Sequence, residues 1–335
     1  MNRQIFKLLA VLAMLSGCGF EENAGDLNTT GNQVDAAVRL ALNWYPETEH
    51  GGYFAAEVGG HFARQGLAVE IIPGGPGAPQ TVIAELAAER IQFAVSSADN
   101  VVRARAAGVP VVAVLAALQD SPRCIMVHES AGFQALADLK NVELAISETR
   151  SFALWMKQEL PLEGVTFVPF NGLVGEFLLK PNFAQQAYVF SEPFIAKEKG
   201  GDPQSLMVSE IGFNPYSSVL ITTESVIAEQ EELVRNVVEC CQKGWVDYLR
   251  SPDESNRYIQ ELNEEMSAAA LAYGATAMQP LCQPEPGQPF GTMTLQRWEE
   301  LVNQITELGE ISEGTVTAAE CFQTRFLVPA TELEN

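Results

Sequence analysis

Alternation of strand and helix signals constrains the fold of this chain more than any other feature. Short apolar runs such as 38–42, 67–72 and 91–95 are each followed by a segment with helical spacing, and this order continues to about residue 222. Apolar runs bounded by Gly and Pro are typical of buried strands, and the helices between them cover the faces of a sheet. The order predicts an α/β protein with parallel sheets that are covered on both faces.

Two strand–helix series follow each other, and the chain passes from the first to the second near Ser121-Pro122. The first series covers residues 36–120 and the second residues 121–214, while residues 215–330 complete the first lobe and add C-terminal helices. We therefore predict two lobes, each a sheet flanked by helices, with hinges near 119–122 and 213–216. Ligands of open α/β sheets bind beyond the carboxyl ends of the strands, so two facing lobes are expected to form a cleft.

Residues 1–18 have the order of a bacterial export signal. Arg3 and Lys7 make the start basic, a short apolar run follows, and Cys18 comes directly after small residues. The apolar run is shorter than the roughly 20 residues that a membrane-spanning helix needs. The pattern resembles the lipobox of bacterial lipoproteins, in which Cys18 is lipidated, and an ordinary secreted protein with a chance cysteine is the alternative. Residues 19–35 are polar and small, and we expect a flexible tether there.

Charge and cysteine content limit the partners and the covalent links. The formal net charge of −23 argues against nucleic acid as a partner, because phosphate binding needs a basic surface. Five cysteines remain when Cys18 is set aside, and an odd number cannot all pair. A disulfide between Cys282 and Cys321 is left open, whereas Cys240 and Cys241 fit packing inside a helix.

The sequence carries no motif that calls for catalysis. Phosphate-binding and dinucleotide-binding glycine loops, the His-Glu-x-x-His pattern and the Gly-x-Ser-x-Gly turn are all absent from it. The three histidines, His50, His61 and His128, do not have the spacing of zinc ligands. We therefore predict no catalytic residue, no cofactor and no metal.

Aromatic and polar side chains follow the first strand. Asn43, Trp44 and Tyr45 come directly after it, and His50 lies further along the same loop. Aromatic rings offer flat faces for stacking and an edge for hydrogen bonding, so these four residues are candidate ligand-binding residues. The alternative for Trp44 is a core residue that closes the lobe.

Glycines and hydroxyl groups follow the next two strands. Gly74 and Gly75 would let the backbone approach a ligand, or would simply form a sharp turn. Ser96, Ser97 and Asp99 open a helix, where free N–H groups favour a carboxylate or another polar group. A helix N-cap is the alternative role for these side chains.

Three further candidate ligand-binding residues lie in the second series or directly after it. Asn171 and Glu192 follow strands, and Tyr216 lies where the chain returns to the first lobe. The Glu192 carboxylate is placed to accept hydrogen bonds from a ligand amino group. It is equally placed to stabilise the N-terminus of the helix that begins at Pro193.

Several of these stretches together resemble a known family over most of residues 38–225. The family is that of the periplasmic solute-binding proteins grouped with the yeast thiamine-pyrimidine synthases. The matching stretches are 42–46 with His50 downstream, 60–70, 74–76, 91–95, 107–111 and 191–194.

The resemblance implies a type II periplasmic-binding fold in which a ligand is held between the lobes by aromatic residues of the first loop. It implies a substrate-binding lipoprotein of an ABC importer in the periplasm or at the cell surface. Its partners would be the permease and the ATPase of the importer. Trp44, Tyr45 and Glu192 would then hold a nitrogen heterocycle, such as a thiamine pyrimidine precursor or riboflavin. More distant relatives imply the alternative of taurine, alkanesulfonate or nitrate-type anions.

Two departures from the family pattern disfavour the synthase activity. The synthases carry a histidine where this chain has Asn100, and a cysteine-rich stretch where this chain has residues 212–218. We therefore predict a binding protein and not an enzyme. A sensor lobe that serves a membrane kinase is a further alternative.

Overall fold

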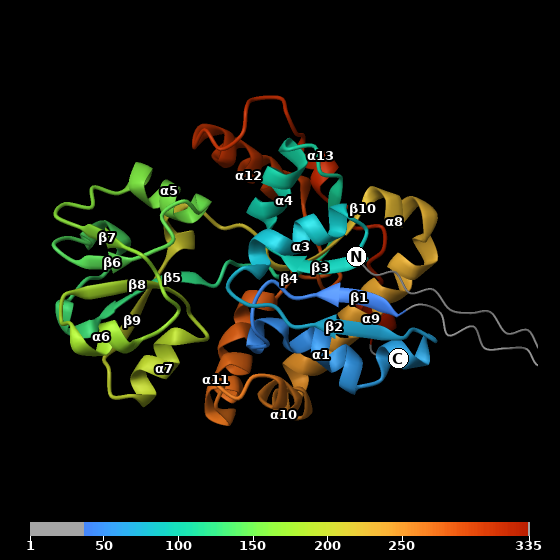
Figure 1. Cartoon of the computed structure of the whole chain (residues 1–335), viewed down its shortest axis with the longest axis horizontal. Coiled ribbons are helices and arrows are strands. Elements are labelled where there is room, and N and C mark those ends of the chain that lie inside the picture. Colours follow the sequence, from blue (N-terminus) through green and yellow to red (C-terminus); the bar gives the residue numbers. More distant parts are fainter. Residues whose placement is uncertain (1–36, 334–335) are drawn as a thin grey trace, which may run out of the picture. The chain divides into compact units, whose positions relative to one another are not determined.

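The computed structural model describes residues 37–333 of the chain. Within this range the chain forms two five-stranded sheets with helices around them (Figure 1). The predicted export signal, Cys18 and the tether at 19–35 lie outside the described residues.

The first sheet has the strand order β2-β1-β3-β10-β4. Its members are β1 (Val38–Ala41), β2 (Val69–Ile72), β3 (Phe93–Ser96), β4 (Val111–Leu118) and β10 (Ser217–Thr223). β1 runs parallel to β2 and β3, whereas β10 runs antiparallel to both of its neighbours, β3 and β4. Every residue of β3, β4 and β10 is buried, so these strands form the centre of the first lobe.

The second sheet has the order β7-β6-β8-β5-β9. Its members are β5 (Arg123–His128), β6 (Glu143–Ala145), β7 (Thr166–Val168), β8 (Phe183–Tyr188) and β9 (Pro203–Met207). β6 is parallel to β7 and β8, and β5 is antiparallel to β8 and β9. All five strands come from one continuous stretch of the chain, which forms the second lobe.

Both sheets are mixed, so the prediction of parallel sheets is wrong. The exceptions are β5 and β10, which are the first strands after the chain passes from one sheet to the other. β4 and β9 end at the side of their sheet that faces the other lobe. The chain therefore enters the next sheet from that same side. The first strand that it forms there, β5 or β10, runs antiparallel to the neighbouring strands, which end at that side.

Helices flank both sheets, as predicted. In the first lobe and the C-terminal region they are α1 (Gly51–Val58), α2 (His61–Arg64), α3 (Ala78–Ala87), α4 (Ala98–Ala106), α8 (Glu224–Glu229), α9 (Glu231–Arg250), α10 (Asp253–Leu262), α11 (Ala268–Met278), α12 (Leu295–Glu307), α13 (Ala318–Cys321) and α14 (Ala330–Leu333). In the second lobe they are α5 (Ser151–Glu159), α6 (Gly175–Leu179) and α7 (Glu192–Glu198). Short 3-10 turns lie at Thr48–His50, Glu129–Ala131, Leu136–Asp138, Val208–Ile211 and Gln279–Cys282. No helix in the described part of the chain has the length and apolar character needed to cross a membrane.

Two pairs of consecutive helices are separated by short breaks. α1 and α2 are separate because Gly60 takes a left-handed conformation, with φ of 70°. α8 ends and α9 begins at Gln230.

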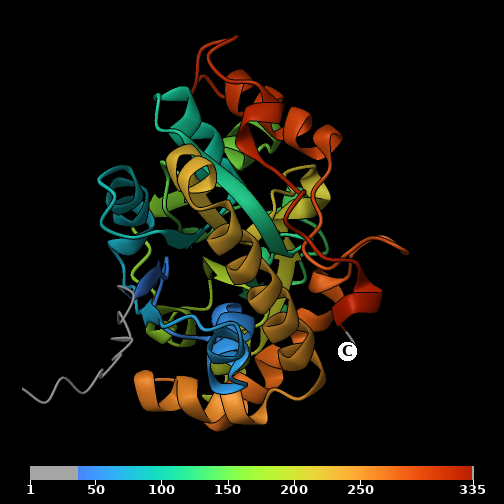
Figure 2. The same ribbon diagram turned by 90° about the vertical axis from the view of Figure 1, so that its right-hand side faces the viewer.

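The packing of α1 against α9 carries much of the core of the first lobe. Figure 2 shows the long α9 running across this face with α1 beside it. The backbones approach so closely that a Cβ atom added at Gly244 would lie 2.3 Å from the Gly52 carbonyl oxygen. Trp245 and Tyr248, both fully buried, fill the space next to the α1 glycines.

The cysteines of residues 37–333 are all free and buried. A disulfide between Cys282 and Cys321, which the sequence left open, is therefore absent. The two thiols belong to different clusters of the hydrophobic core, so they do not meet.

We expect Gly244→Ala to lower the free energy of unfolding by about 1–3 kcal/mol, because its Cβ would overlap backbone atoms of α1 that cannot move independently. Urea denaturation measures the change. Gly175→Ala in α6 is the matched control, since a Cβ atom there meets nothing within 4 Å, and its effect should stay within about 0.5 kcal/mol. Equal effects of the two substitutions would contradict the close helix contact.

Candidate functional site

A cavity of about 40 Å³ lies where the two sheets face each other. It is lined by residues of both lobes and of the two connecting segments. These residues are Ser97, Asp99, Ser121, Arg123, Arg150, Phe152, Tyr188, Phe213, Pro215 and Ser217. Ser97 follows β3 and Tyr188 ends β8, so the cavity lies beyond the carboxyl ends of strands, where α/β sheets bind ligands.

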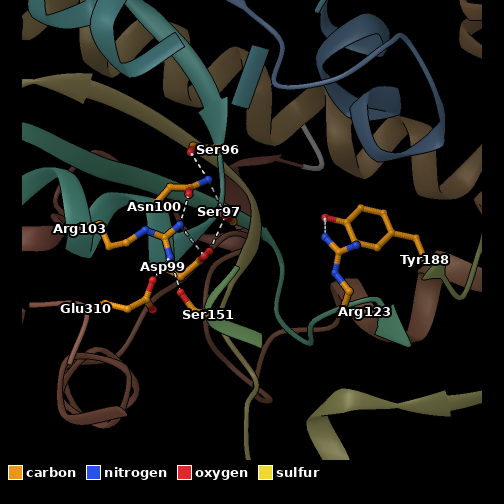
Figure 3. Close-up of polar contacts among 9 residues, drawn as sticks. All are labelled: Ser96, Ser97, Asp99, Asn100, Arg103, Arg123, Ser151, Tyr188 and Glu310. Carbon is orange, nitrogen blue, oxygen red and sulfur yellow. Dashed lines mark hydrogen bonds and ion pairs between the residues drawn. The ribbon is translucent and has the colours of Figure 1, made fainter. Parts of the chain in front are cut away.

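Arg123, the first residue of β5, is central to this cavity. Its guanidinium carbon lies 4.2 Å from the centre of the Tyr188 ring and 4.7 Å from that of Phe152. Its Nη2 atom donates to the Tyr188 hydroxyl oxygen at 3.1 Å (Figure 3). The two rings therefore hold a flat cation in place at the wall of the cavity.

Arg150 is a second guanidinium that lines the cavity. Burial lowers its pKa, and repulsion from Arg123 and Arg103 adds to this effect, although Asp99 opposes it. Among residues 37–333, neither Arg123 nor Arg150 has a carboxylate oxygen within the 4.0 Å of an ion pair. Two guanidinium groups thus face the cavity, and each has N–H donors that can bind a ligand.

Three carboxyl groups, which we call the carboxyl trio, lie close to Arg123. Glu47 and Glu49 belong to the loop after β1 and are 7% and 2% exposed, and Glu192 is the first residue of α7. Burial raises the pKa of Glu47 well above its usual value, and repulsion from Glu49 and Glu192 raises it further. Burial raises the pKa of Glu49 to about 7 and also raises that of Glu192.

Asn43 connects His50 to the carboxyl trio. The Asn43 side-chain amide donates to Glu49 Oε1 at 3.2 Å, so its oxygen accepts from His50 Nε2 at 2.9 Å. His50 is completely buried, and burial lowers its pKa to about 3, so the ring is neutral. These hydrogen bonds orient the Glu49 carboxyl group, so Asn43 and His50 help to position it.

A second polar network links the two lobes at α4 (Figure 3). Ser97 donates its hydroxyl proton to Asp99 Oδ1 at 2.5 Å, and Arg103 donates to Asp99 Oδ2 at 3.0 Å. Arg103 also donates to Ser151 at the start of α5 and to Glu310 at 3.1 Å. Because Ser151 belongs to the second lobe, Arg103 ties the lobes together beside the cavity.

The same network engages the other polar groups after β3. The Asn100 amide donates to Ser97 Oγ at 3.0 Å and to Ser96 Oγ at 3.4 Å, and its oxygen accepts from Arg103. Burial alone would raise the pKa of Asp99, but Arg103, the Ser97 hydroxyl and the more distant arginines lower it below its usual value. Asp99 is therefore ionised, and Ser97 has its donor already in use.

The aromatic loop and the glycine turn of the sequence prediction pack against each other. Trp44 is half-buried, Tyr45 is 46% exposed, and their rings meet edge to face with centres 5.6 Å apart. A Cβ atom at Gly74 would lie 2.3 Å from the Leu42 carbonyl oxygen, and one at Gly75 would lie 3.6 Å from the Tyr45 ring. Gly74 is thus required for the close approach of the loop, whereas a side chain at Gly75 would make an ordinary contact with Tyr45.

Of the residues predicted to bind ligand, Ser97 and Asp99 line the cavity and the others do not. Asn171 and Tyr216 have partners of their own in the structure. Asn171 is exposed on the loop after β7, where its side-chain oxygen accepts from the Leu173 backbone N–H at 2.9 Å. Tyr216 is 2% exposed and accepts at its hydroxyl from the Thr294 backbone N–H at 3.1 Å, with the Arg297 guanidinium 3.9 Å from its ring centre. Both side chains have structural partners, and neither lines the cavity.

Several site residues escaped the sequence prediction. Arg123 directly follows Ser121-Pro122, where the chain changes lobe, and its place at the start of a strand carries no motif. Glu47 and Glu49 lie in the same loop as Trp44. Their negative charge was the feature of the sequence that could have identified them as site residues.

A larger hollow of about 370 Å³ lies between α10 and α11. It is lined by Asp253, Asn256, Arg257, Gln260, Ala268 and Ala272, on one side of the C-terminal helices. It brings together neither aromatic rings nor the two lobes, so we place the functional site at the smaller cavity. Within residues 37–333, no group of three or more His, Cys, Asp or Glu side chains is arranged to hold a metal ion.

The fold agrees with what comparisons with known proteins show. The profile of the family described as NMT1/THI5 like matches residues 47–255, more than half of the 335 residues, and the chain belongs to this family. The fold is the two-lobed type II periplasmic-binding fold, as predicted.

Two relatives in sequence are named binding proteins. The formylaminopyrimidine-binding protein of Halalkalibacterium halodurans is 23% identical over 341 residues, which cover 96% of this chain and 98% of that protein. The riboflavin-binding protein RibY of Chloroflexus aurantiacus is 23% identical over 229 residues, or 65% of this chain and 64% of that protein.

A solved structure shares the fold at low sequence identity. The periplasmic aliphatic sulphonate binding protein SsuA from Escherichia coli has a TM-score of 0.66 and 14% identity. The match covers 86% of this chain and 92% of that protein.

We expect Asp99→Asn to lower the free energy of unfolding by about 1–3 kcal/mol at neutral pH, because it removes the charge that Arg103 and Ser97 bind. The folded-state pKa of Asp99 is depressed, so its contribution is present above the unfolded-state value and is lost as the pH falls through the folded-state value. Urea unfolding should therefore show the two proteins converging in acid. Asp253→Asn, at an exposed position, is the control, and a difference that does not change with pH would contradict the assignment.

Proposed function

We propose that this protein is the substrate-binding component of an ABC importer, and that it captures a small nitrogen heterocycle between its lobes without transforming it. One observation carries the proposal: aromatic rings and two guanidinium groups from both lobes line one cavity, and the carboxyl trio, with Glu47 and Glu49 buried and Glu192 half-buried, lies close to Arg123.

The chemistry of the site matches that of a heterocycle. Carboxyl groups accept hydrogen bonds from ring or amino N–H groups, and guanidinium groups donate to ring nitrogens and carbonyl oxygens. Trp44 and Tyr45 offer ring faces at the first-lobe side, and Phe152 and Tyr188 offer them at the second. A ligand that combines a flat face with both donors and acceptors would use all three kinds of group.

The size of the cavity implies that the lobes open and close. A volume of about 40 Å³ has room for very few water molecules, whereas sites for organic ligands measure roughly 300–1,000 Å³. A heterocycle therefore enters only after the lobes move apart, which the two connecting segments near 119–122 and 213–216 would permit by hinge motion.

The names of the relatives support a heterocycle as the ligand, and they also suggest a second class of ligand. Two of them are named for formylaminopyrimidine and riboflavin, both heterocycles. SsuA is named for aliphatic sulphonates, and the unpaired Arg123 and Arg150 would suit such an anion. Taurine, an alkanesulfonate or a nitrate-type anion is therefore the alternative ligand.

The remaining parts of the proposal concern location and partners. A lipid on Cys18 would hold the protein at a membrane, in the periplasm or at the cell surface, beside its permease and ATPase. The order of residues 1–18 supports this anchor, which fractionation of cells carrying Cys18→Ala would test. Release of the variant into the soluble fraction is the expected result.

Calorimetric titration with formylaminopyrimidine, riboflavin, taurine and an alkanesulfonate tests the ligand class. For a heterocycle, Trp44→Ala should weaken binding by about 1–3 kcal/mol, the cost of a lost stacking face, whereas Trp44→Phe should retain most of the affinity. If only an anion binds and Trp44→Ala leaves its affinity unchanged, the anion alternative is correct. Turnover of a bound ligand would contradict the proposal altogether.

A further inference from the structure

The carboxyl trio is drawn from both lobes, and this placement has a consequence for closure. We propose that Glu47, Glu49 and Glu192 form an electrostatic gate, so that the lobes close fully only when the trio takes up a proton. The inference concerns regulation of the proposed binding site, but the closing motion can be tested without any ligand.

The members of the carboxyl trio lie on opposite sides of the boundary between the lobes. Glu47 and Glu49 lie on the first-lobe loop after β1, and Glu192 lies on α7 of the second lobe. The Ser191 hydroxyl, next to Glu192 in the chain, donates to Glu47 Oε2 at 3.4 Å. Closing the lobes therefore removes water from carboxyl groups that approach each other from opposite sides.

The structure shows the lobes in contact on both sides of the cavity. Beside the trio, the rings of Phe194 and Tyr273 stack with centres 4.5 Å apart. Beside α4, Gln158 donates to Glu307 at 2.6 Å, and Arg103 donates to Ser151. The contact of Ser191 with Glu47, and the closeness of Arg123 to Glu47 and Glu49, therefore belong to the closed arrangement.

The trio carries more negative charge than its surroundings balance. Among residues 37–333, Arg123 of β5 is the cation that acts on all three carboxyl groups. Without protonation, three carboxylates would share one guanidinium in a site with little water, and such a site is costly.

The other titratable groups around the trio do not change their charge near pH 7. Tyr53 of α1, Tyr188 of β8 and Tyr248 of α9 all have their pKa raised by burial, so their hydroxyls remain protonated. His50, next to Glu49, is neutral because burial lowers its pKa to about 3. Asp99 and Arg150 interact with Arg123 from the other side of the cavity and keep their charges. The trio is therefore the group of this site that changes charge between mildly acid and mildly alkaline pH.

The sign of the effect follows from the direction of the pKa shifts. Burial raises the pKa of Glu49 from an ordinary value of 4.5 to about 7, and it raises those of Glu47 and Glu192. Below the lower value the carboxyl group is protonated in the open and in the closed state, so closure is not opposed. As the pH rises toward the higher value, closure requires proton uptake, and its equilibrium constant falls by up to about tenfold per pH unit for each proton. A ligand amino group that donates to the trio would take the place of the proton.

Small-angle X-ray scattering of the ligand-free protein, from about pH 4.5 to about pH 8.5 at fixed ionic strength, tests the gate. We expect the radius of gyration to decrease as the pH falls, because the closed form is more compact. The variant Glu47→Gln/Glu49→Gln should be compact over the whole range, since it has lost two of the three charges. Glu313→Gln, at an exposed position, is the matched control and should follow the wild-type curve.

Circular dichroism at each pH confirms that the chain remains folded during the titration. A wild-type radius that does not change with pH would overturn the gate, and so would a double variant that keeps the wild-type dependence. Failure of the proposed function is a separate result: the gate would operate while none of the solutes binds.

Discussion

Burial of charged side chains between two lobes is the physical constraint on which this structure depends. A charge removed from water is tolerated only where partners or protons compensate it. On one side of the cavity, Asp99 and Arg103 compensate each other and join α4 to α5. On the other side, three carboxyl groups share the influence of Arg123 and are left under-compensated. The first arrangement stabilises contact between the lobes, and the second makes it conditional.

The path of the chain explains why these groups meet. Each lobe directs the carboxyl ends of most of its strands toward the other lobe, which places Ser97 after β3 and Tyr188 at the end of β8 at the cavity. The two strands that run in the opposite direction begin at this same boundary, which places Arg123 at the start of β5 and Ser217 at the start of β10. Residues distant in sequence are thereby brought to one cavity without any local motif.

Much of the fold could be predicted from the sequence because it rests on local patterns. The alternation of apolar runs with helical spacing indicated the α/β class and the helical C-terminal region, and resemblance of short stretches indicated the family. The direction of β5 and β10 could not be predicted, because it follows from the crossings between sheets and not from the residues of the strands.

The residues of the candidate site were harder to predict from the sequence than the fold. Its ligand-binding residues stay a prediction, and Tyr216 shows the difficulty, since a tyrosine at a crossing can equally be a core residue under α12. Arg123 and Arg150 could not be recognised as site residues from the sequence, because only long-range packing places them at the cavity.

A crystal structure of the protein with a bound solute from the titration panel tests the central claim most directly. The account predicts electron density between the lobes, in contact with Trp44 or Glu49 on one side and with Arg123 or Tyr188 on the other. Density in the hollow between α10 and α11, with the space around Arg123 unchanged, would contradict it.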